Sequence, residues 1–186
     1  MIIGLTGRNA SGKGTAADWF VAQHFGYVSL SDAIRHALRE QGLEPTRDNM
    51  IAAGRGLRTS GGAGVLAEKT LPQIAAGADF VVDSIRNPAE VQVLRQRHDF
   101  VLLDIQADEA ARYARLSTRA RAGDALDFAE FQRQERAELH SGDAAAQQLL
   151  STAALADIVV PNDGDVAALT AKLRQILSEL RLRFAA

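Results

Sequence analysis

The chain has 186 residues, of which 47% are hydrophobic, and it carries a formal net charge of −2 at pH 7. This charge gives no general signature for binding nucleic acid or a membrane surface, and the absence of cysteine excludes disulfides and thiol catalysis. The first apolar run is too short for a signal peptide, and no segment resembles a membrane span. We therefore expect one cytoplasmic domain, monomeric or homodimeric, with no nucleic-acid or membrane partner.

Short apolar runs alternate with helical patterns along the chain. Runs rich in Val, Ile and Leu predict strands at Met1–Thr6, Tyr27–Ser29, Asp79–Asp83, Phe100–Ile105 and Ile158–Val160. Helices are predicted at Lys13–Phe25, Ala33–Gln41, Arg47–Thr59, Val65–Ala76, Pro88–Gln96, Asp108–Arg121, Asp127–His140, Asp143–Ala153 and Val166–Phe184. This alternation favours an α/β fold, with a doubly wound parallel sheet between two layers of helices.

The first predicted strand leads directly into a phosphate-binding loop, Gly7-x-x-x-x-Gly12-Lys13. Glycines let the main chain wrap closely around phosphate oxygens, and the helix that follows points its free N–H groups at the same anion. Lys13 adds a cation for the outer phosphates and is a predicted catalytic residue. The residues predicted to bind ATP here are Gly7, Arg8, Asn9, Ala10, Ser11, Gly12, Lys13, Gly14 and Thr15.

The residues at the end of this loop indicate how Mg²⁺ would be held. In many phosphate-binding loops a Ser or Thr directly after the lysine ligates Mg²⁺, but here Gly14 takes that place and the hydroxyl comes at Thr15. We therefore expect Mg²⁺ to be held mainly through water and phosphate. Asp83, at the end of the third predicted strand, is the carboxylate expected to organise the ion together with Thr15.

Charged residues follow the second and third predicted strands. Asp32 and Arg35 come after the second strand, and we expect them to lie near the phosphate-binding loop. The alternative is that Asp32 caps a helix and Arg35 is solvated. Arg86 follows Asp83 closely, and its guanidinium is suited to bind a phosphate at the mouth of the sheet. The alternative for Asp83 and Arg86 is a helix cap beside an exposed side chain. The long connection 31–78 is the predicted acceptor-binding insertion.

A second long excursion, 112–154, is the predicted helical lid. It begins with Arg112, Arg115 and Arg119, which are three and four residues apart and therefore share one helix face. Cations on one face repel one another unless an anion such as a triphosphate neutralises them, and the alternative is a basic face paired with nearby carboxylates. For Arg133 and Arg136, further along the lid, a solvated face is the favoured interpretation.

Together these residues resemble the P-loop nucleoside monophosphate kinase superfamily, which includes adenylate kinases, deoxynucleoside monophosphate kinases and dephospho-CoA kinases. The resemblance covers nearly the whole chain and implies a five-stranded parallel sheet of order 2-3-1-4-5 with a helical lid. It is carried by Gly7–Thr15, Asp32 with Arg35, Asp83 with Arg86, the lid arginines Arg115, Arg119 and Arg121, and Ala156–Gly164. Arg86 stands one place earlier than the corresponding arginine of adenylate kinases.

A narrower resemblance concerns a group of dephospho-CoA-kinase-like proteins. The segments that carry it are Tyr27–Arg35, Val82–Val91 and Ala144–Leu149. Some members of that group are fused to deoxycytidylate deaminase domains, which hints at deoxynucleotide metabolism.

The resemblance implies transfer of the γ-phosphoryl group of ATP, with Mg²⁺, to a nucleoside or deoxynucleoside monophosphate. Its implied catalytic residues are Lys13, Asp83, Arg115 and Arg119. Arg115, as a lid arginine, and Asn162, in the stretch near the donor base, are further residues implied to bind ATP. Its implied acceptor-binding residues are Asp32, Arg35, Arg55, Arg58 and Arg86. One alternative is a dephospho-CoA kinase with Asp32 as the general base, and another is a nucleotide-binding or regulatory ATPase module without kinase activity.

Overall fold

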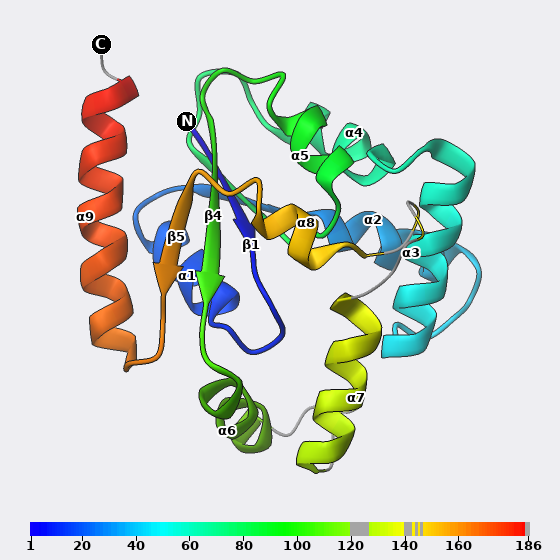
Figure 1. Cartoon of the computed structure of the whole chain (residues 1–186). Coiled ribbons are helices and arrows are strands. Elements are labelled where there is room, and N and C mark those ends of the chain that lie inside the picture. The colour runs from blue at the N-terminus through cyan, green and yellow to red at the C-terminus, as the bar shows by residue number, and fades with distance from the viewer. Residues whose placement is uncertain (120–126, 140–142, 144, 146, 185–186) are drawn as a thin grey trace.

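In the computed structural model, five parallel strands form one sheet in the order β2-β3-β1-β4-β5 (Figure 1). The structure describes residues 1–119, 127–139, 143, 145 and 147–184. The strands are β1 (Ile2–Thr6), β2 (Gly26–Ser29), β3 (Phe80–Asp83), β4 (Phe100–Gln106) and β5 (Ile158–Pro161). Each neighbouring pair is parallel. The predicted α/β class and strand order are confirmed.

Helices cover both faces of this sheet. They are α1 (Lys13–Ala22), α2 (Leu30–Glu40), α3 (Arg47–Gly61), α4 (Val65–Thr70), α5 (Pro88–Leu94), α6 (Glu109–Arg119), α7 (Phe128–Leu139), α8 (Leu149–Ala153) and α9 (Val166–Phe184), with a short 3₁₀ turn at Leu71–Gln73. Side chains of α1 and α9 form one core cluster with the sheet, and those of α2, α4 and α5 form the other. Figure 1 shows α9 and α8 on opposite sides of the central strands.

Alternation along the central strand explains the two clusters. Successive side chains of a strand point to opposite faces, so Ile3 and Leu5 of β1 enter the α1/α9 cluster while Ile2 enters the other. Every residue of β1 is buried. A strand covered on both faces needs apolar residues at consecutive positions, which is the pattern that the sequence presents.

Several helix boundaries differ from the predicted ones for local reasons. The first helix ends at Ala22 instead of Phe25, because His24 adopts a left-handed φ of 69°. The helix predicted over 65–76 ends at Thr70, since Pro72 cannot donate a helical hydrogen bond and a 3₁₀ turn follows. The helix predicted from residue 143 begins at Leu149, because Gln148 has non-helical angles.

The second helix begins earlier than predicted. It starts at Leu30 with Ser29 as its N-cap residue. Asp32 therefore lies inside the first turn and does not cap the helix, which corrects that alternative. Arg121 and His140, at the predicted ends of two lid helices, lie outside the described residues. The division into an insertion at 31–78 and a lid at 112–154 stays a prediction. Among the described helices, none is both long and apolar enough to cross a membrane.

Candidate functional site

The loop after β1 has the tight backbone that its glycines predict. Gly7 and Gly12 have φ angles of 136° and 105°. A Cβ atom on Gly7 would lie 2.3 Å from the carbonyl oxygen of Ile105, and one on Gly12 would lie 2.2 Å from Nδ2 of Asn162. Both positions therefore require glycine, because neither the backbone angle nor the neighbouring atoms accommodate a side chain.

Lys13, the first residue of α1, folds back over this loop. Its ammonium donates hydrogen bonds to the carbonyl oxygens of Gly7 (2.7 Å) and Arg8 (2.8 Å). The charge is thus held at the N-terminal end of α1, where the free N–H groups of a ten-residue helix also gather. This arrangement can bind an anion that offers several oxygens at once, as a polyphosphate does.

The end of β5 supports the loop from the side. The side-chain amide of Asn162 donates a hydrogen bond to the carbonyl oxygen of Ser11 (2.8 Å), and Asn162 is only 6% exposed. Arg115 of α6 donates from Nη2 to the carbonyl oxygens of Asn162 (2.7 Å) and Gly164 (3.0 Å). Arg115 and Asn162, both predicted to bind ATP, are therefore brought together beside the loop, and Nη1 of Arg115 is buried without a hydrogen-bond partner among the described residues.

Asp83 ends β3, the strand that pairs with β1. Its Oδ2 accepts hydrogen bonds from the hydroxyls of Tyr27 (3.5 Å) and Ser84 (3.4 Å). Its Oδ1 is buried and has no partner within the described part of the chain. Burial and the nearby Asp83 carboxylate raise the pKa of Tyr27, so this hydroxyl keeps its proton. An unpaired buried carboxylate oxygen fits a hydrated Mg²⁺ ion, since its desolvation is otherwise uncompensated.

A group of hydroxyls lies along the same edge, between β2 and β3. Ser29 contacts Ser31 (2.9 Å) and donates to Ser84 (3.2 Å), and Ser84 has a left-handed φ of 65°. Arg35 donates to the Ser31 hydroxyl (2.8 Å) and to the Asp32 carboxylate (2.7 Å). The predicted pair Asp32 and Arg35 thus lies at this edge as an ion pair. A non-glycine residue in the left-handed region is costly and marks a site that the surrounding structure holds in place.

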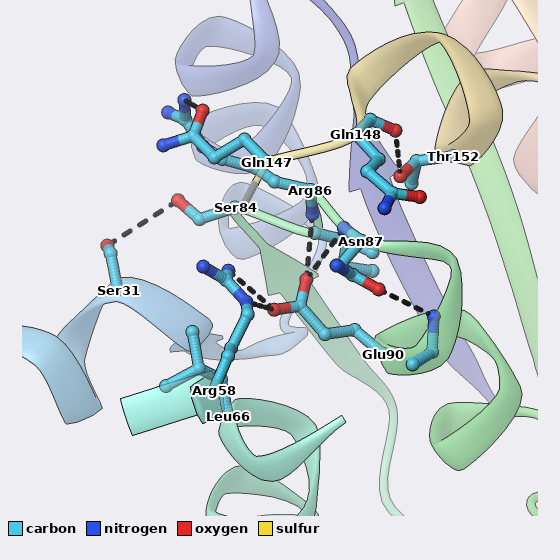
Figure 2. Close-up of polar contacts among 12 residues, drawn as sticks. Ser31, Arg58, Leu66, Ser84, Arg86, Asn87, Glu90, Gln147, Gln148 and Thr152 are labelled. Carbon is cyan, nitrogen blue, oxygen red and sulfur yellow. Dashed lines mark hydrogen bonds and ion pairs between the residues drawn. The ribbon is translucent and has the colours of Figure 1, made fainter. Parts of the chain in front are cut away.

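Arg86 and Arg58 occupy different environments. The Arg86 guanidinium is half-buried and donates to the side-chain oxygen of Gln147 (3.0 Å). Arg58 is buried against Glu90, with its Nη2 2.7 Å from the carboxylate (Figure 2). This differs from the predicted substrate-binding role of Arg58, because a guanidinium that is 4% exposed and bound to a carboxylate does not line an open pocket. The prediction missed Glu90, although Asn87-Pro88-Ala89-Glu90 is a capping-box pattern that marks this glutamate as the N3 residue of α5.

The remaining predicted arginines are spread along the insertion and the lid. Arg55 is exposed on α3 and forms an ion pair with Asp143 (2.7 Å). Arg112 does not share an open face with Arg115, because it is 1% exposed and forms a buried ion pair with Glu135 of α7. The alternative of pairing with a carboxylate is therefore the correct one for Arg112. Arg119 ends α6, and Arg121 lies outside the described residues.

The helices α6 and α7 pack against the loop. Leu116 and Phe131 form a small buried cluster with Ala10 of the loop. Arg8 lies 3.8 Å from the carboxylate of Glu135, which joins the loop to α7. A cavity of about 510 Å³ lies beside these contacts, lined by loop residues and by parts of β4, α6, α7 and α8. The predicted lid helices thus lie beside the phosphate-binding loop.

The fold is shared with solved structures, some of which are named as kinases. The chain is similar to TT1252 from Thermus thermophilus (TM-score 0.60, 21% identity, 97% of both chains) and to shikimate kinase from Bacteroides thetaiotaomicron (TM-score 0.60, 14% identity, 96% of this chain and 98% of that one). A sugar kinase from Janibacter sp. is also similar (TM-score 0.54, 16% identity, 95% and 94%). At these identities the likeness shows the fold alone, a P-loop kinase-like α/β structure.

Curated proteins match along the whole chain. A UPF0200 protein of Methanoculleus marisnigri is 35% identical over 184 residues, covering 96% of both chains. A second, from Methanothrix thermoacetophila, is 34% identical and covers 96% of this chain and 97% of its own. The UPF0200/UPF0201 protein of Archaeoglobus fulgidus is 32% identical over 187 residues, which are 55% of its length. No protein-family model matches the chain. From these identities and this coverage, the chain belongs to the UPF0200 family.

Proposed function

We propose that the protein is an ATP-dependent phosphotransferase that moves the γ-phosphoryl group of ATP to a nucleoside or deoxynucleoside monophosphate. The observation that carries this proposal is the position of Arg86. It follows the strand next to the phosphate-binding loop, and its guanidinium is bonded to the neutral side chain of Gln147. A phosphate group is a stronger partner for a guanidinium than an amide oxygen is, so an anionic acceptor would replace Gln147.

The roles of the residues follow from their places at the sheet edge. The loop amides and Lys13 hold the β- and γ-phosphates, and Arg86 and Arg35 hold the acceptor phosphate. Arg115 and Arg119 neutralise charge on the migrating group. A bound Mg²⁺ would supply positive charge that offsets the charge of the phosphates. Asp83 would hold its water shell through Oδ1. No protein nucleophile is required, because positioning and charge stabilisation supply the catalysis.

A hydroxyl acceptor is the second candidate. Two of the similar structures are a shikimate kinase and a sugar kinase, whose names imply alcohol substrates. Such a reaction needs a carboxylate that takes a proton, and the unpaired Oδ1 of Asp83 is one candidate. Asp32, the base expected for a dephospho-CoA kinase, is 61% exposed and bonded to Arg35. An ion pair this exposed is weak and leaves both partners available, so the preference for a monophosphate rests on Arg86, whose guanidinium is bonded to a neutral side chain.

The proposal is tested by ADP formation from ATP and Mg²⁺ with a panel of acceptors. The panel comprises AMP, CMP, GMP, UMP, their deoxy forms, dephospho-CoA and a reaction without acceptor. We expect one monophosphate to raise ADP formation more than about tenfold over the acceptor-free rate. A signal with dephospho-CoA alone would favour the hydroxyl acceptor. Bound ATP without turnover across the panel would favour a nucleotide-binding module and contradict the proposal.

A further inference from the structure

One carboxylate behind the acceptor edge collects four hydrogen bonds. Glu90, in the first turn of α5, is fully buried, and its Oε1 accepts from Nε (3.0 Å) and Nη2 (2.7 Å) of Arg58. Its Oε2 accepts from the main-chain N–H groups of Arg86 (2.8 Å) and Asn87 (3.1 Å). Figure 2 shows this carboxylate between the Arg58 side chain and the turn that carries Arg86. Both of its oxygens are thus bonded, as a buried charge requires.

Arg58 supplies the opposite charge from a distant segment. It lies on α3, 32 residues before Glu90, and its side chain is 4% exposed. Burial raises the pKa of the Glu90 carboxyl, while Arg58 and the two amides oppose this shift. The guanidinium binds only Oε1, which leaves Oε2 for the main chain of the turn. The ion pair therefore does more than fill the core, because one half of the carboxylate fixes a backbone segment.

Arg86 is held at three points as a result. Glu90 accepts its N–H, the N–H of Gln148 donates to its carbonyl oxygen (2.9 Å), and its guanidinium donates to Gln147 (3.0 Å). The first contact comes from α5, and the other two come from the segment that precedes α8. A main chain fixed on both sides limits the directions in which the long side chain can extend, which lowers the entropy lost when it binds an anion.

We propose that Glu90, held by Arg58, is a positioning residue that sets the main chain of Arg86 and so presents its guanidinium to an anionic group of the acceptor. This inference rests on the proposed function, since it takes Arg86 as the residue that receives the acceptor phosphate. Neither Glu90 nor Arg58 touches the acceptor, because both act through the backbone of the turn. Arg58 therefore contributes to acceptor binding indirectly, through Glu90.

A purely packing role for the pair makes a different prediction. Replacing a buried ion pair by apolar residues of similar volume is often tolerated, so the double variant Arg58→Met/Glu90→Leu can keep the fold. Its apolar side chain at position 90 cannot accept hydrogen bonds from the main-chain N–H groups of Arg86 and Asn87. A packing role would leave acceptor binding unchanged in the folded variant, whereas a positioning role would weaken it.

Steady-state kinetics distinguish the packing role from the positioning role. The acceptor used is the one from the panel that gives the most ADP. In Arg58→Met/Glu90→Leu we expect the acceptor KM to rise about tenfold or more, with the ATP KM and acceptor-free ADP release within about twofold of wild type. Arg95→Met/Asp157→Asn is the matched control, because it removes an ion pair (2.9 Å) at the other end of α5. An unchanged acceptor KM in the folded double variant would overturn the proposal.

A binding experiment tests the same inference without turnover. Inorganic phosphate is titrated into protein saturated with ADP and Mg²⁺, and the Nε–H signal of Arg86 is followed by ¹⁵N NMR. We expect a shift in wild type and an affinity weakened about tenfold in the double variant, or in Glu90→Gln if the double variant does not fold. Glu90-dependent phosphate binding without kinase activity would sustain this inference and contradict the proposed function. An Arg86 signal that does not respond in wild type, or responds equally in the variant, would overturn the inference.

Discussion

The side-chain amide of Asn162 donates a hydrogen bond to the carbonyl oxygen of Ser11 (2.8 Å), and this bond joins the end of β5 to the phosphate-binding loop across 151 residues of sequence. The amide occupies the space that a side chain on Gly12 would need. The end of β5 therefore supports the loop through this side chain. Under the proposed function the loop positions the phosphates of ATP, so this contact would link the last strand of the sheet to ATP binding.

Asn162→Asp should weaken ATP binding specifically. A carboxylate at this position cannot donate to the Ser11 carbonyl and repels it, which would shift the loop. We expect the ATP KM to rise about tenfold and the unfolding free energy to fall by about 1–3 kcal/mol, with the acceptor KM little changed. Kinetics with each substrate varied in turn, and urea denaturation, measure these effects. An ATP KM equal to that of wild type would show that the bond does not support the loop.

Lys13→Ala should abolish transfer while the fold survives. The ammonium donates hydrogen bonds to the carbonyl oxygens of Gly7 and Arg8, and water can replace it at these carbonyls when it is removed. We expect kcat to fall by about a hundredfold or more, because the charge at the outer phosphates is lost. Thermal denaturation checks that the protein is folded. Full activity in this variant would remove Lys13, and the loop with it, from the site.

Asp83→Asn should separate activity from stability. The amide keeps one oxygen for the hydroxyls of Tyr27 and Ser84, and it removes a charge whose other oxygen is buried and unpaired. We expect kcat to fall about a hundredfold and the Mg²⁺ concentration for half-maximal rate to rise, while the unfolding free energy stays equal or increases by about 1 kcal/mol. A Mg²⁺ titration and urea denaturation test this, and an unaltered Mg²⁺ dependence would contradict the role of Asp83.

Arg35→Ala should affect the acceptor more than ATP. Arg35 lies at the β2 edge, beside the Ser31 hydroxyl, and its side chain is 49% exposed. We expect the acceptor KM to rise about tenfold and the ATP KM to stay within about twofold. Arg39→Ala is the control, since Arg39 is exposed in the last turn of the same helix. Equal effects on both KM values, or none, would remove Arg35 from the acceptor site.

Asp99→Asn should change the acid stability of the protein. Burial opposes ionisation of Asp99, yet hydrogen bonds from Arg97 (3.0 Å each) and the terminal amino group of Met1 hold its pKa below the usual value. A lowered pKa stabilises the fold above the unfolded value of about 3.9, and this contribution is lost as the pH falls through the folded pKa. We expect the variant to be less stable by about 1 kcal/mol at pH 7. Urea denaturation at pH 7 and at pH 3 or below should show this difference shrinking in acid, and a constant difference would contradict the assignment.

The sequence predicts local features of this molecule well and long-range pairs poorly. The loop from Gly7 to Lys13 is a contiguous signal whose backbone follows from its glycines, and the strand order follows from the resemblance to P-loop kinases. The pairing of Arg58 with Glu90 depends on how α3 and α5 each pack on α4, which no sequence spacing reveals. The resemblance implied a substrate-binding role for Arg58, because it carries no information about this buried pairing.

The lid shows a second limit of the sequence. Helical spacing predicts that Arg112 and Arg115 share one face, but tertiary packing buries Arg112 against Glu135 and directs Arg115 to the main chain at the end of β5. Ser84 is a further feature that the sequence does not reveal. It has a left-handed φ of 65°, although a serine gives no signal for this conformation as a glycine would. Such strain is set by the surrounding contacts and not by the residue's own preference.

The most direct test of the proposed function follows the phosphoryl group itself. ATP labelled with ³²P at the γ-position is incubated with Mg²⁺ and each monophosphate of the panel, and the labelled products are separated for wild type and Lys13→Ala. The proposal predicts label in a single nucleoside diphosphate with wild type and none with Lys13→Ala. Label found only in inorganic phosphate, or in the same product with both proteins, would contradict it.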